Sequence, residues 1–366
     1  MPDSEIADAV RASLGAVEIP GGATLADYPG LSDIIVTKSA VAFTISVEPG
    51  MEGAFGPARA AAEEAATRVS GGRRVLASMT ADRAPAGSQG GGASQMGRNQ
   101  PPARQGVPGI GAIIAVASGK GGVGKSTCAV NLALALQGQG LKVGVLDADL
   151  YGPSIPKLLK LEGKPAVRDD GIFSPHESYG LKAMSIGSML EKDQAVVWRG
   201  PMATSALRQL LRETEWGEID VLLIDLPPGT GDIQISLCQQ VELAGAIIVS
   251  TPQDLALIDA RKAIDMFARL KIPILGLIEN MSFFIAPDTG ARYDIFGHGG
   301  AKTAADELGI SFLGEVPLHM SIREQSDAGA PVVAAFPESP EAMGFEEIAR
   351  RIHSRLGDSE KTGTVG

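Results

Sequence analysis

From residue 112 onward, short and almost wholly apolar runs alternate with longer segments in which apolar residues recur every three or four positions. The first pattern is typical of buried strands and the second of amphipathic helices. The strand-like runs are 112–118, 142–148, 220–226, 245–251, 273–280 and 311–317. The helix-like segments lie near 125–138, 203–213, 232–243, 256–270, 299–309 and 342–356. Apolar strands that alternate with helices predict an α/β fold with a doubly wound, mainly parallel sheet.

The chain before this alternation is organised differently. Its first 83 residues follow the order α-β-β-α-β, with an Ala-rich helical pattern at 56–69. Residues 84–111 are rich in Gly and Pro and hold no large aromatic side chain, so they cannot bury enough apolar surface to offset the cost of ordering. We therefore expect a small α+β domain at 1–83, a flexible linker at 84–111, a larger domain at 112–357 and a disordered tail at 358–366.

Charge and cysteine content narrow the functional classes. The formal net charge is −11, which disfavours general nucleic-acid binding because nucleic-acid-binding domains usually carry a basic patch. No apolar run is long enough to span a membrane, and the first residues lack the apolar region of a signal peptide. The two cysteines, Cys128 and Cys238, are too few for a disulfide framework. We expect a protein of the reducing cytoplasm that binds neither nucleic acid nor membrane.

The segment GKGGVGKST follows one predicted strand and opens a predicted helix, which is the context of a phosphate-binding loop. Its glycines let backbone N–H groups surround phosphate oxygens without a Cβ clash, and the helix N-terminus favours an anion. The alternative is a glycine-rich turn without a ligand. In the phosphate-binding interpretation, one lysine neutralises the β- and γ-phosphates and the serine hydroxyl binds Mg²⁺. The predicted nucleotide-binding residues of the loop are Gly119, Lys120, Gly121, Gly122, Val123, Gly124, Lys125, Ser126 and Thr127.

Three acidic residues stand at the ends of the next two predicted strands. Asp147 and Asp149 end the second strand, where carboxylates can reach the Mg²⁺ shell or orient an attacking water, but can also cap a helix or lie in solvent. Asp225 follows four apolar residues at the end of the third strand, where P-loop proteins hold Mg²⁺ directly or through water. We predict Ser126, Asp147 and Asp225 as Mg²⁺ ligands and Asp149 as catalytic. The amide of Gly229, in the loop after Asp225, is a candidate sensor of the γ-phosphate.

Seven motifs in order carry a resemblance to a known family. They are SGKGGVGKST, DADLYGPSIPKLL, WRGP, DLPPGTGD, TPQDLALID, ENMSFF and IFGHGGA. Over residues 108–356 the chain resembles the Mrp/ApbC-type ATPases, which belong to the class of P-loop dimers that includes MinD, ParA and the nitrogenase iron protein. The resemblance implies a homodimer that binds and slowly hydrolyses Mg-ATP. It also implies that the protein binds iron–sulfur clusters and delivers them to apoprotein clients.

The resemblance assigns further residues. In this class a lysine at the position of Lys120 reaches into the partner's site and contacts its phosphates, which implies a catalytic role beside that of Lys125. Asn280 would hydrogen-bond the adenine, with Glu279 beside it, and Pro317 would pack along the base. The unit at 1–83 resembles the small domain often found ahead of these ATPases, without the cysteine that such domains usually carry.

The chain departs from the family at one place. Many members carry C-P-x-C-G shortly after ENMS, where thiolates of two subunits would hold one bridging cluster, but residues 286–290 read A-P-D-T-G. Iron–sulfide chemistry needs thiolates, and we expect Cys128 and Cys238 to be buried. We therefore expect an intact ATPase without the usual bridging site, and the ligands of any cluster stay unknown. The alternatives are a regulatory ATPase and a MinD/ParA-like positioning ATPase, the latter disfavoured by the acidic charge.

Overall fold

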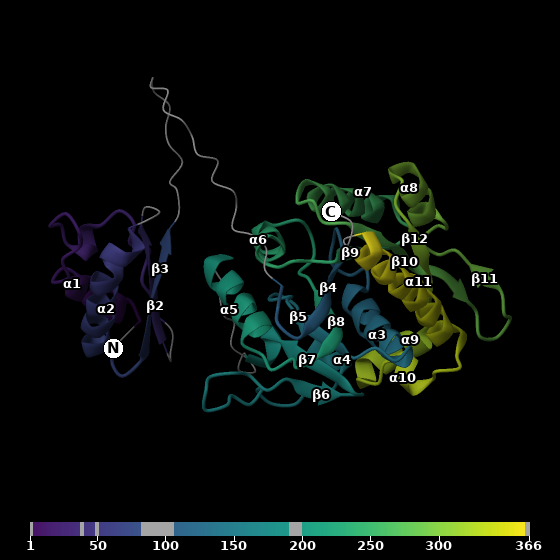
Figure 1. Cartoon of the computed structure of the whole chain (residues 1–366), viewed down its shortest axis with the longest axis horizontal. Helices are drawn as coiled ribbons and strands as arrows, with labels where there is room; N and C mark the ends of the chain where they lie inside the picture. Colours follow the sequence, from purple (N-terminus) through teal and green to yellow (C-terminus); the bar gives the residue numbers. More distant parts are fainter. Residues whose placement is uncertain (1–2, 37–39, 48–50, 82–105, 190–199, 363–366) are drawn as a thin grey trace, which may run out of the picture. The chain divides into compact units, whose positions relative to one another are not determined.

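The computed structural model describes residues 3–36, 40–47, 51–81, 106–189 and 200–362. The chain forms two compact units, Met1–Gly97 and Arg98–Gly366 (Figure 1). Most of the predicted linker, residues 84–105, lies outside the described residues.

The first unit has the predicted order of elements. Its helices and strands are α1 (Asp3–Leu14), β1 (Ile35–Val36), β2 (Ala40–Val47), α2 (Glu52–Val69) and β3 (Arg74–Ala81). β2 pairs with β1 antiparallel and with β3 parallel. Val10, Leu14 and Ala62 of the helices are buried with Phe43 and Ile45 of β2 in one cluster. This unit therefore has an apolar core of its own.

A nine-stranded sheet forms the centre of the second unit. Its strands are β4 (Ile110–Ala117), β5 (Val143–Asp147), β6 (His176–Ser178), β7 (Leu181–Ser185), β8 (Ile219–Asp225), β9 (Gly245–Ser250), β10 (Ile274–Ile285), β11 (Arg292–Tyr293) and β12 (Phe312–Leu318). They are ordered β11-β10-β9-β4-β8-β5-β7-β6, and β12 pairs with β10. Paired strands are parallel except β6 with β7 and β10 with β11. The predicted mainly parallel α/β fold is confirmed.

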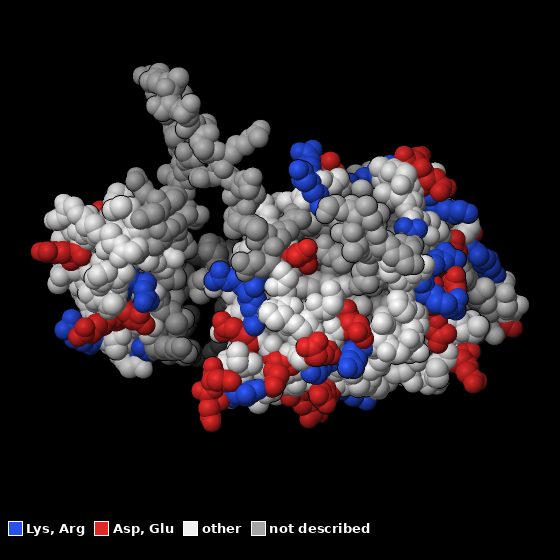
Figure 2. Space-filling model, viewed as in Figure 1, with Lys and Arg blue, Asp and Glu red and all other residues white. Residues whose placement is uncertain are grey.

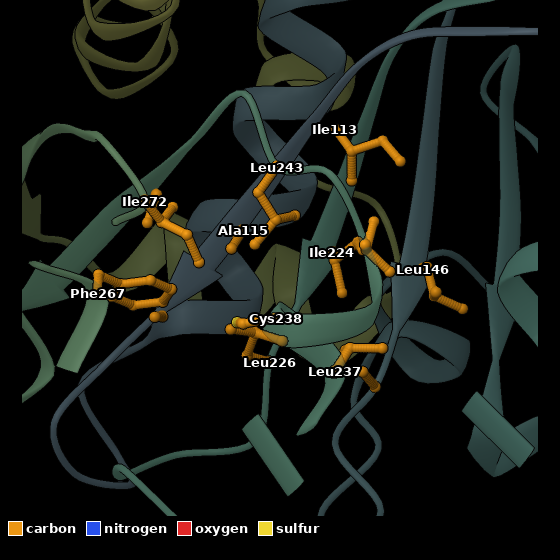
Figure 3. Close-up of a cluster of buried hydrophobic side chains, with 14 of the residues drawn as sticks. Ile113, Ala115, Leu146, Ile224, Leu226, Leu237, Cys238, Leu243, Phe267 and Ile272 are labelled. Carbon is orange, nitrogen blue, oxygen red and sulfur yellow. The ribbon is translucent and has the colours of Figure 1, made fainter. Parts of the chain in front are cut away.

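Helices cover both faces of this sheet because its central strands are apolar on both faces. On β4, Ile113 and Ala115 belong to one core, and Ile114 and Val116 belong to the other. The first core, part of which is drawn in Figure 3, is covered by α5 (Gly200–Arg212), α6 (Asp232–Gln240), α7 (Asp254–Arg269) and α8 (Gly300–Leu308). The second core is covered by α3 (Lys125–Gly138), α4 (Ile155–Leu158), α10 (Val332–Ala335) and α11 (Pro340–Thr362). In Figure 1, α11 runs alongside α3, and α9 (Met320–Ala328) packs beside α4 and α10.

Many charged side chains lie at the surface of the large unit. Over the face of the large unit seen in Figure 2, acidic and basic groups are interspersed. Some of them pair within one helix, as Asp265 pairs with Arg269 in α7. Exposed pairs of this kind contribute little to stability, so the stability of the unit rests on its two apolar cores.

The structure adds a β-hairpin that the apolar pattern did not predict. Its strands β6 and β7 are joined by Tyr179 and Gly180, whose φ angles of +51° and +78° are those of a type I′ turn. This turn usually carries Asn-Gly, so Tyr-Gly gives a weak turn signal. Strands of three and five residues are also too short to show a period.

Two predicted boundaries are corrected. β4 begins at Ile110 and Val107 is buried in the first core, so residues 106–111 belong to the large unit and not to the linker. Helix α11 continues to Thr362, so residues 358–362 are helical and not a disordered tail. The first error arises because two apolar residues at the end of a polar tract pack against the sheet. The second arises because Glu and Lys extend a helix beyond its apolar stripe.

Candidate nucleotide-binding site

A cleft of about 500 Å³ lies at the carboxyl ends of β4 and β5. Its walls come from the loop after β4, the loop after β5, and helices α4 and α9. In doubly wound sheets ligands bind at this edge, and the volume suits a small-molecule ligand. The predicted phosphate-binding loop forms one wall, so the cleft is the candidate nucleotide site.

The phosphate-binding loop needs its glycines for conformation and for space. Gly122 and Gly124 have φ angles of +82° and +81°, which L side chains rarely adopt. An added Cβ would collide with the backbone of Asp259 at Gly119, and with the side-chain amide of Asn280 at Gly124. The loop therefore stays tightly curled at the N-terminus of α3, where backbone N–H groups and the helix dipole favour an anion.

Lys125, Ser126 and Asp225 meet at the floor of the cleft. Nζ of Lys125 lies 2.7 Å from Oδ1 of Asp225, and the hydroxyl of Ser126 donates to Oδ2 at 2.5 Å. Lys125 is 6% exposed and Asp225 is fully buried. Burial raises the pKa of Asp225, while the Lys125 ammonium and the Ser126 hydroxyl act in the opposite direction. The structure thus brings together the predicted phosphate cation and two predicted Mg²⁺ ligands.

Asp147 lies behind the cleft surface and is fully buried. Its oxygens accept hydrogen bonds from the backbone N–H groups of Asp149 and Ile155 and from the hydroxyl of Ser185. Burial and the nearby carboxylate of Asp225 raise the pKa of Asp147 to about 7. These contacts make Asp147 an internal support of the loop after β5. The role of Asp147 as a Mg²⁺ ligand stays a prediction. To bind the ion, its oxygens would have to coordinate Mg²⁺ while they also accept these hydrogen bonds.

Asp149 borders the cleft. One of its oxygens accepts the N–H groups of Tyr151 and Gly152, at 3.2 and 3.1 Å, which fixes the carboxylate at the start of the next loop. The two acids of the D-A-D motif therefore differ in their surroundings. Asp147 is enclosed by protein donors, and Asp149 has access to whatever occupies the cleft.

Lys120 and Gly229 have partners away from the cleft floor. Nζ of the half-buried Lys120 lies 3.5 Å from Oε1 of Gln253, just before α7. The amide of Gly229 donates to the carbonyl of Ser118 at 2.9 Å. This amide was predicted to sense the γ-phosphate, and it would first have to leave Ser118. Lys120 also borders the cleft, on the side that faces Gln253.

The predicted adenine contacts lie beside the loop and are not among the cleft walls. Asn280 is 6% exposed, and its Nδ2 donates to the carbonyl of Val123 at 2.7 Å. Pro317 is half-buried in β12, next to Val316, which pairs with Asn280. Glu279 is fully buried and points away from the loop, as expected for neighbouring residues of a strand.

Glu279 anchors the start of α8. Its carboxylate accepts the backbone N–H groups of Gly299 and Ala301, at 3.2 and 2.7 Å, and the hydroxyl of Ser282 at 2.6 Å. Sequence reasoning placed Glu279 beside the adenine and missed this role. Nothing in the sequences of the two motifs, ENMS and FGHGGA, indicated that these segments are in contact.

The sequence analysis also missed a pair at the rim of the cleft. Lys157 of α4 and Asp327 of α9 both line the cleft and form an ion pair at 3.1 Å. Lys157 lies in the motif DLYGPSIPKLL, but its partner is 170 residues further along the chain. A pairing at this distance along the chain leaves no local pattern.

The segment where the family usually carries C-P-x-C-G and the two cysteines lie in different surroundings. Residues 286–290 form the tip of a hairpin, with the Gly290 amide bonded to the carbonyl of Ala286 at 2.8 Å. Cys128 and Cys238 are both fully buried, as predicted. Burial and the charge of Asp225 raise the pKa of the Cys128 thiol to about 12.

One group of ligand-type side chains gathers where β10 pairs with β12, beside the loop before α8. Atoms of Glu279, His298 and Glu315 lie within 4.8 Å of one another. Arg292 lies among them, 2.8 Å from Nδ1 of His298 and 4.0 Å from Glu315, with its guanidinium over the ring of Phe283. Arg292 therefore already contacts two members of this group, His298 and Glu315.

A phosphate-binding loop after β4, with a buried acid at the end of the adjacent strand β8, defines a nucleotide-binding P-loop protein. A family model described as "ParA: NUBPL iron-transfer P-loop NTPase" matches residues 109–353. The chain belongs to this family. Its predicted resemblance to the Mrp/ApbC-type ATPases is confirmed.

Named relatives agree with this assignment. The chain is 50% identical over 252 residues to the iron-sulfur cluster transfer protein NUBPL of Dictyostelium discoideum, covering 68% of this chain and 78% of that protein. It is 50% identical over 260 residues to the iron-sulfur cluster carrier protein of Escherichia coli, covering 71% of this chain and 69% of that protein.

Solved structures share the fold of the large unit. A nucleotide-binding protein from Archaeoglobus fulgidus, in complex with ADP and with cobalt found in it, has a TM-score of 0.57 and 43% identity over 64% of this chain and 92% of that one. The cell-division ATPase MinD of Pyrococcus furiosus has a TM-score of 0.52 and 24% identity over 67% of this chain and 99% of that one, and it supports the fold alone. Among the described residues, no helix is both long enough and apolar enough to cross a membrane.

Proposed function

We propose that this chain is a slow, magnesium-dependent ATPase that works as a cytoplasmic homodimer in the transfer of iron–sulfur clusters to apoproteins. The observation that carries the proposal is the buried contact among Lys125, Ser126 and Asp225 at the cleft floor. A cation, a hydroxyl and a carboxylate beside a phosphate-binding loop are the groups that phosphoryl transfer from Mg-ATP requires. The names of the relatives support the cluster-transfer part.

Different residues of the site would bind the phosphates and the Mg²⁺ ion. Backbone N–H groups of residues 121–127 would hold the phosphates. Lys125 would leave its ion pair with Asp225 and contact the β- and γ-phosphates instead. Ser126 and Asp225 offer the oxygen ligands that Mg²⁺ prefers, with Asp147 behind them as a third candidate. Bound Mg²⁺ would supply positive charge to the phosphate oxygens.

Asp149 and Gly229 would respond to the γ-phosphate. Asp149 borders the cleft, so its carboxylate can orient an attacking water. The Gly229 amide would exchange the carbonyl of Ser118 for a phosphate oxygen, which makes the loop after β8 the part that differs between nucleotide states. Asn280, already held against Val123, and Pro317 would contact the adenine.

Exposed apolar residues beside the cleft support the homodimer. Tyr151, two residues after Asp149, is 73% exposed, and Leu255 and Ile258 at the start of α7 are 73% and 51% exposed. Exposed apolar side chains beside a functional site are typical of an interaction surface. Lys120 contacts Gln253, just before these α7 residues, so a second copy seated here would bring Lys120 close to its nucleotide.

A regulatory ATPase that handles no cluster is the second candidate, and the burial of both cysteines favours it. A positioning ATPase of the MinD type has support from the fold alone. The test measures phosphate release and cluster transfer together, using the full-length chain, a cluster-loaded scaffold protein and an apo-ferredoxin acceptor.

We expect EDTA to stop phosphate release and Mg-ATP to speed transfer relative to ADP. Phosphate release without any effect on transfer would replace the main proposal with the regulatory one. Binding to anionic vesicles or to DNA that depends on ATP would favour the positioning ATPase. Failure to bind ATP would contradict all three.

A further inference from the structure

The relatives of this chain are named as carriers of iron–sulfur clusters, and such clusters are held mainly by cysteine thiolates. The sequence of this chain contains two cysteines. A site built on this chain would therefore need Cys128, Cys238 or both at a surface.

The two cysteines lie in different cores. Cys128 of α3 belongs to the cluster on one face of the sheet, together with Leu132, and Cys238 of α6 belongs to the cluster on the other face. The sheet itself stands between them, so the two sulfurs cannot converge on one cluster. Two copies of the chain cannot bring them together either, because each sulfur is enclosed within its own copy.

Burial excludes each cysteine separately. Both are 0% exposed. Figure 3 shows Cys238 among labelled apolar side chains that include Leu226, Leu237 and Phe267. Cys128 is enclosed beneath the phosphate-binding loop, three residues after Lys125 on the same helix. Exposing either sulfur would open a core on which the fold depends.

No oxygen and nitrogen site replaces the thiolates among the described residues. The group of Glu279, His298 and Glu315 already has Arg292 as its cation. The carboxylate of Glu279 also accepts hydrogen bonds from the backbone amides at the start of α8. Carboxylates and imidazole are moreover a poor match for iron–sulfide chemistry.

We propose that this chain holds no iron–sulfur cluster on its own side chains, and that a partner protein supplies all the thiolates for any cluster whose transfer it drives. The inference rests on the proposed function, because it concerns the cargo of that function. The partner is a protein with cysteine thiolates at its surface, and this chain contributes nucleotide-dependent contact. Ligation and catalysis are then separated between two proteins.

The test is anaerobic reconstitution of the full-length chain with ferrous iron, sulfide and a thiol reductant, followed by desalting. Iron, acid-labile sulfide and the visible absorption spectrum are measured with and without ATPγS. The Escherichia coli carrier, reconstituted in parallel, is the positive control for the method. The variants are Cys128→Ser, Cys238→Ser and the double Cys128→Ala/Cys238→Ala, which keeps both core sites apolar.

We expect less than about 0.1 cluster per dimer for the wild type and for every variant, while the control takes up its cluster. A stoichiometric cluster lost in either single variant would show ligation by that thiol and overturn the proposal. A cluster that survives in the double variant would overturn it as well, because other side chains would then be the ligands.

The same preparations are assayed for ATP-dependent transfer from a loaded scaffold protein to apo-ferredoxin. Faster transfer with ATP by an iron-free chain supports both proposals. An iron-free chain with no effect on transfer supports the ligation inference and contradicts the transfer function. A loaded wild-type chain that transfers its cluster contradicts the ligation inference alone.

Discussion

Lys120 and Lys125 lie five residues apart in one loop, but their surroundings assign them different tasks. Lys125 is buried against Asp225 at the cleft floor, and Lys120 is half-buried beside Gln253 near the exposed start of α7. We propose that the first position serves the nucleotide of its own subunit. The second can serve a nucleotide across an interface.

Lys125→Ala should weaken ATP binding by about 30- to 150-fold, because a hydrogen bond from a charged group contributes about 2–3 kcal/mol. Titration with a fluorescent ATP analogue measures the change. Lys142→Ala is the matched control, since Lys142 is exposed just before β5, away from the cleft. Equal affinities for the two variants would remove Lys125 from the phosphate site.

Lys120→Ala should leave ATP affinity within about twofold of the wild type and slow hydrolysis by about tenfold or more, because its proposed target is the partner's transferring phosphate. Steady-state phosphate release is measured at protein concentrations where the wild type is dimeric. Mixing Lys120→Ala with Lys125→Ala subunits adds a second readout. Recovery of part of the activity in the mixture supports action in trans, and a wild-type rate for Lys120→Ala alone contradicts it.

Asp149→Asn should lower kcat by about 100-fold with little change in KM, because the carboxylate is proposed to act on water in the transition state. Asn keeps the size of the side chain and an oxygen that can accept the Tyr151 and Gly152 amides. A rise in KM with unchanged kcat would assign Asp149 to ground-state binding instead.

At the scale of elements, β10 is the strand whose role the sequence least revealed. Its apolar first half was predicted correctly, but it continues to Ile285 because the polar ENMS segment remains in the sheet. Met281, with a φ of +54°, marks the irregularity after Asn280, where the pairing with β12 shifts register. Just before it, Asn280 holds the phosphate-binding loop and Glu279 holds α8, from opposite faces of the strand.

Glu279→Gln should lower the free energy of unfolding by about 1–3 kcal/mol, because an amide nitrogen cannot accept the N–H groups that the buried carboxylate now accepts. Chemical denaturation of the full chain measures the change. Glu307→Gln is the matched control: Glu307 lies on α8 but is exposed, in an ion pair with Arg261, and should cost less than about 1 kcal/mol. Equal losses would show that Glu279 contributes no more than a surface charge.

At the scale of the whole molecule, the sequence predicted the sheet and most helices because each central strand is an apolar run and each long helix has an apolar stripe. It located the phosphate-binding loop because the glycines, lysine and serine are adjacent in sequence. It could not separate Asp147 from Asp149, since the difference depends on Ser185 of β7, a strand too short to predict. Contacts between segments far apart in sequence are therefore the part that required the structure.

The exposed residues of α7 give a test of the assembly as a whole. Leu255→Glu should prevent nucleotide-dependent dimerisation without altering the fold, because Leu255 is 73% exposed and belongs to no core. Placing a charge on an apolar contact opposes association, whereas a solvent-exposed position tolerates it in the monomer. Mass measured by light scattering with ATPγS and with ADP should show a dimer for the wild type with ATPγS and a monomer for the variant under both conditions. Met343→Glu is the matched control, since Met343 is 58% exposed on α11, which lines no part of the nucleotide cleft, and it should dimerise as the wild type does.

Leu255→Glu should also lose hydrolysis to the level of Lys120→Ala, because both changes remove the same lysine from the partner's site. A dimeric Leu255→Glu variant with normal turnover would place the interface on another face and leave Lys120 without its proposed target.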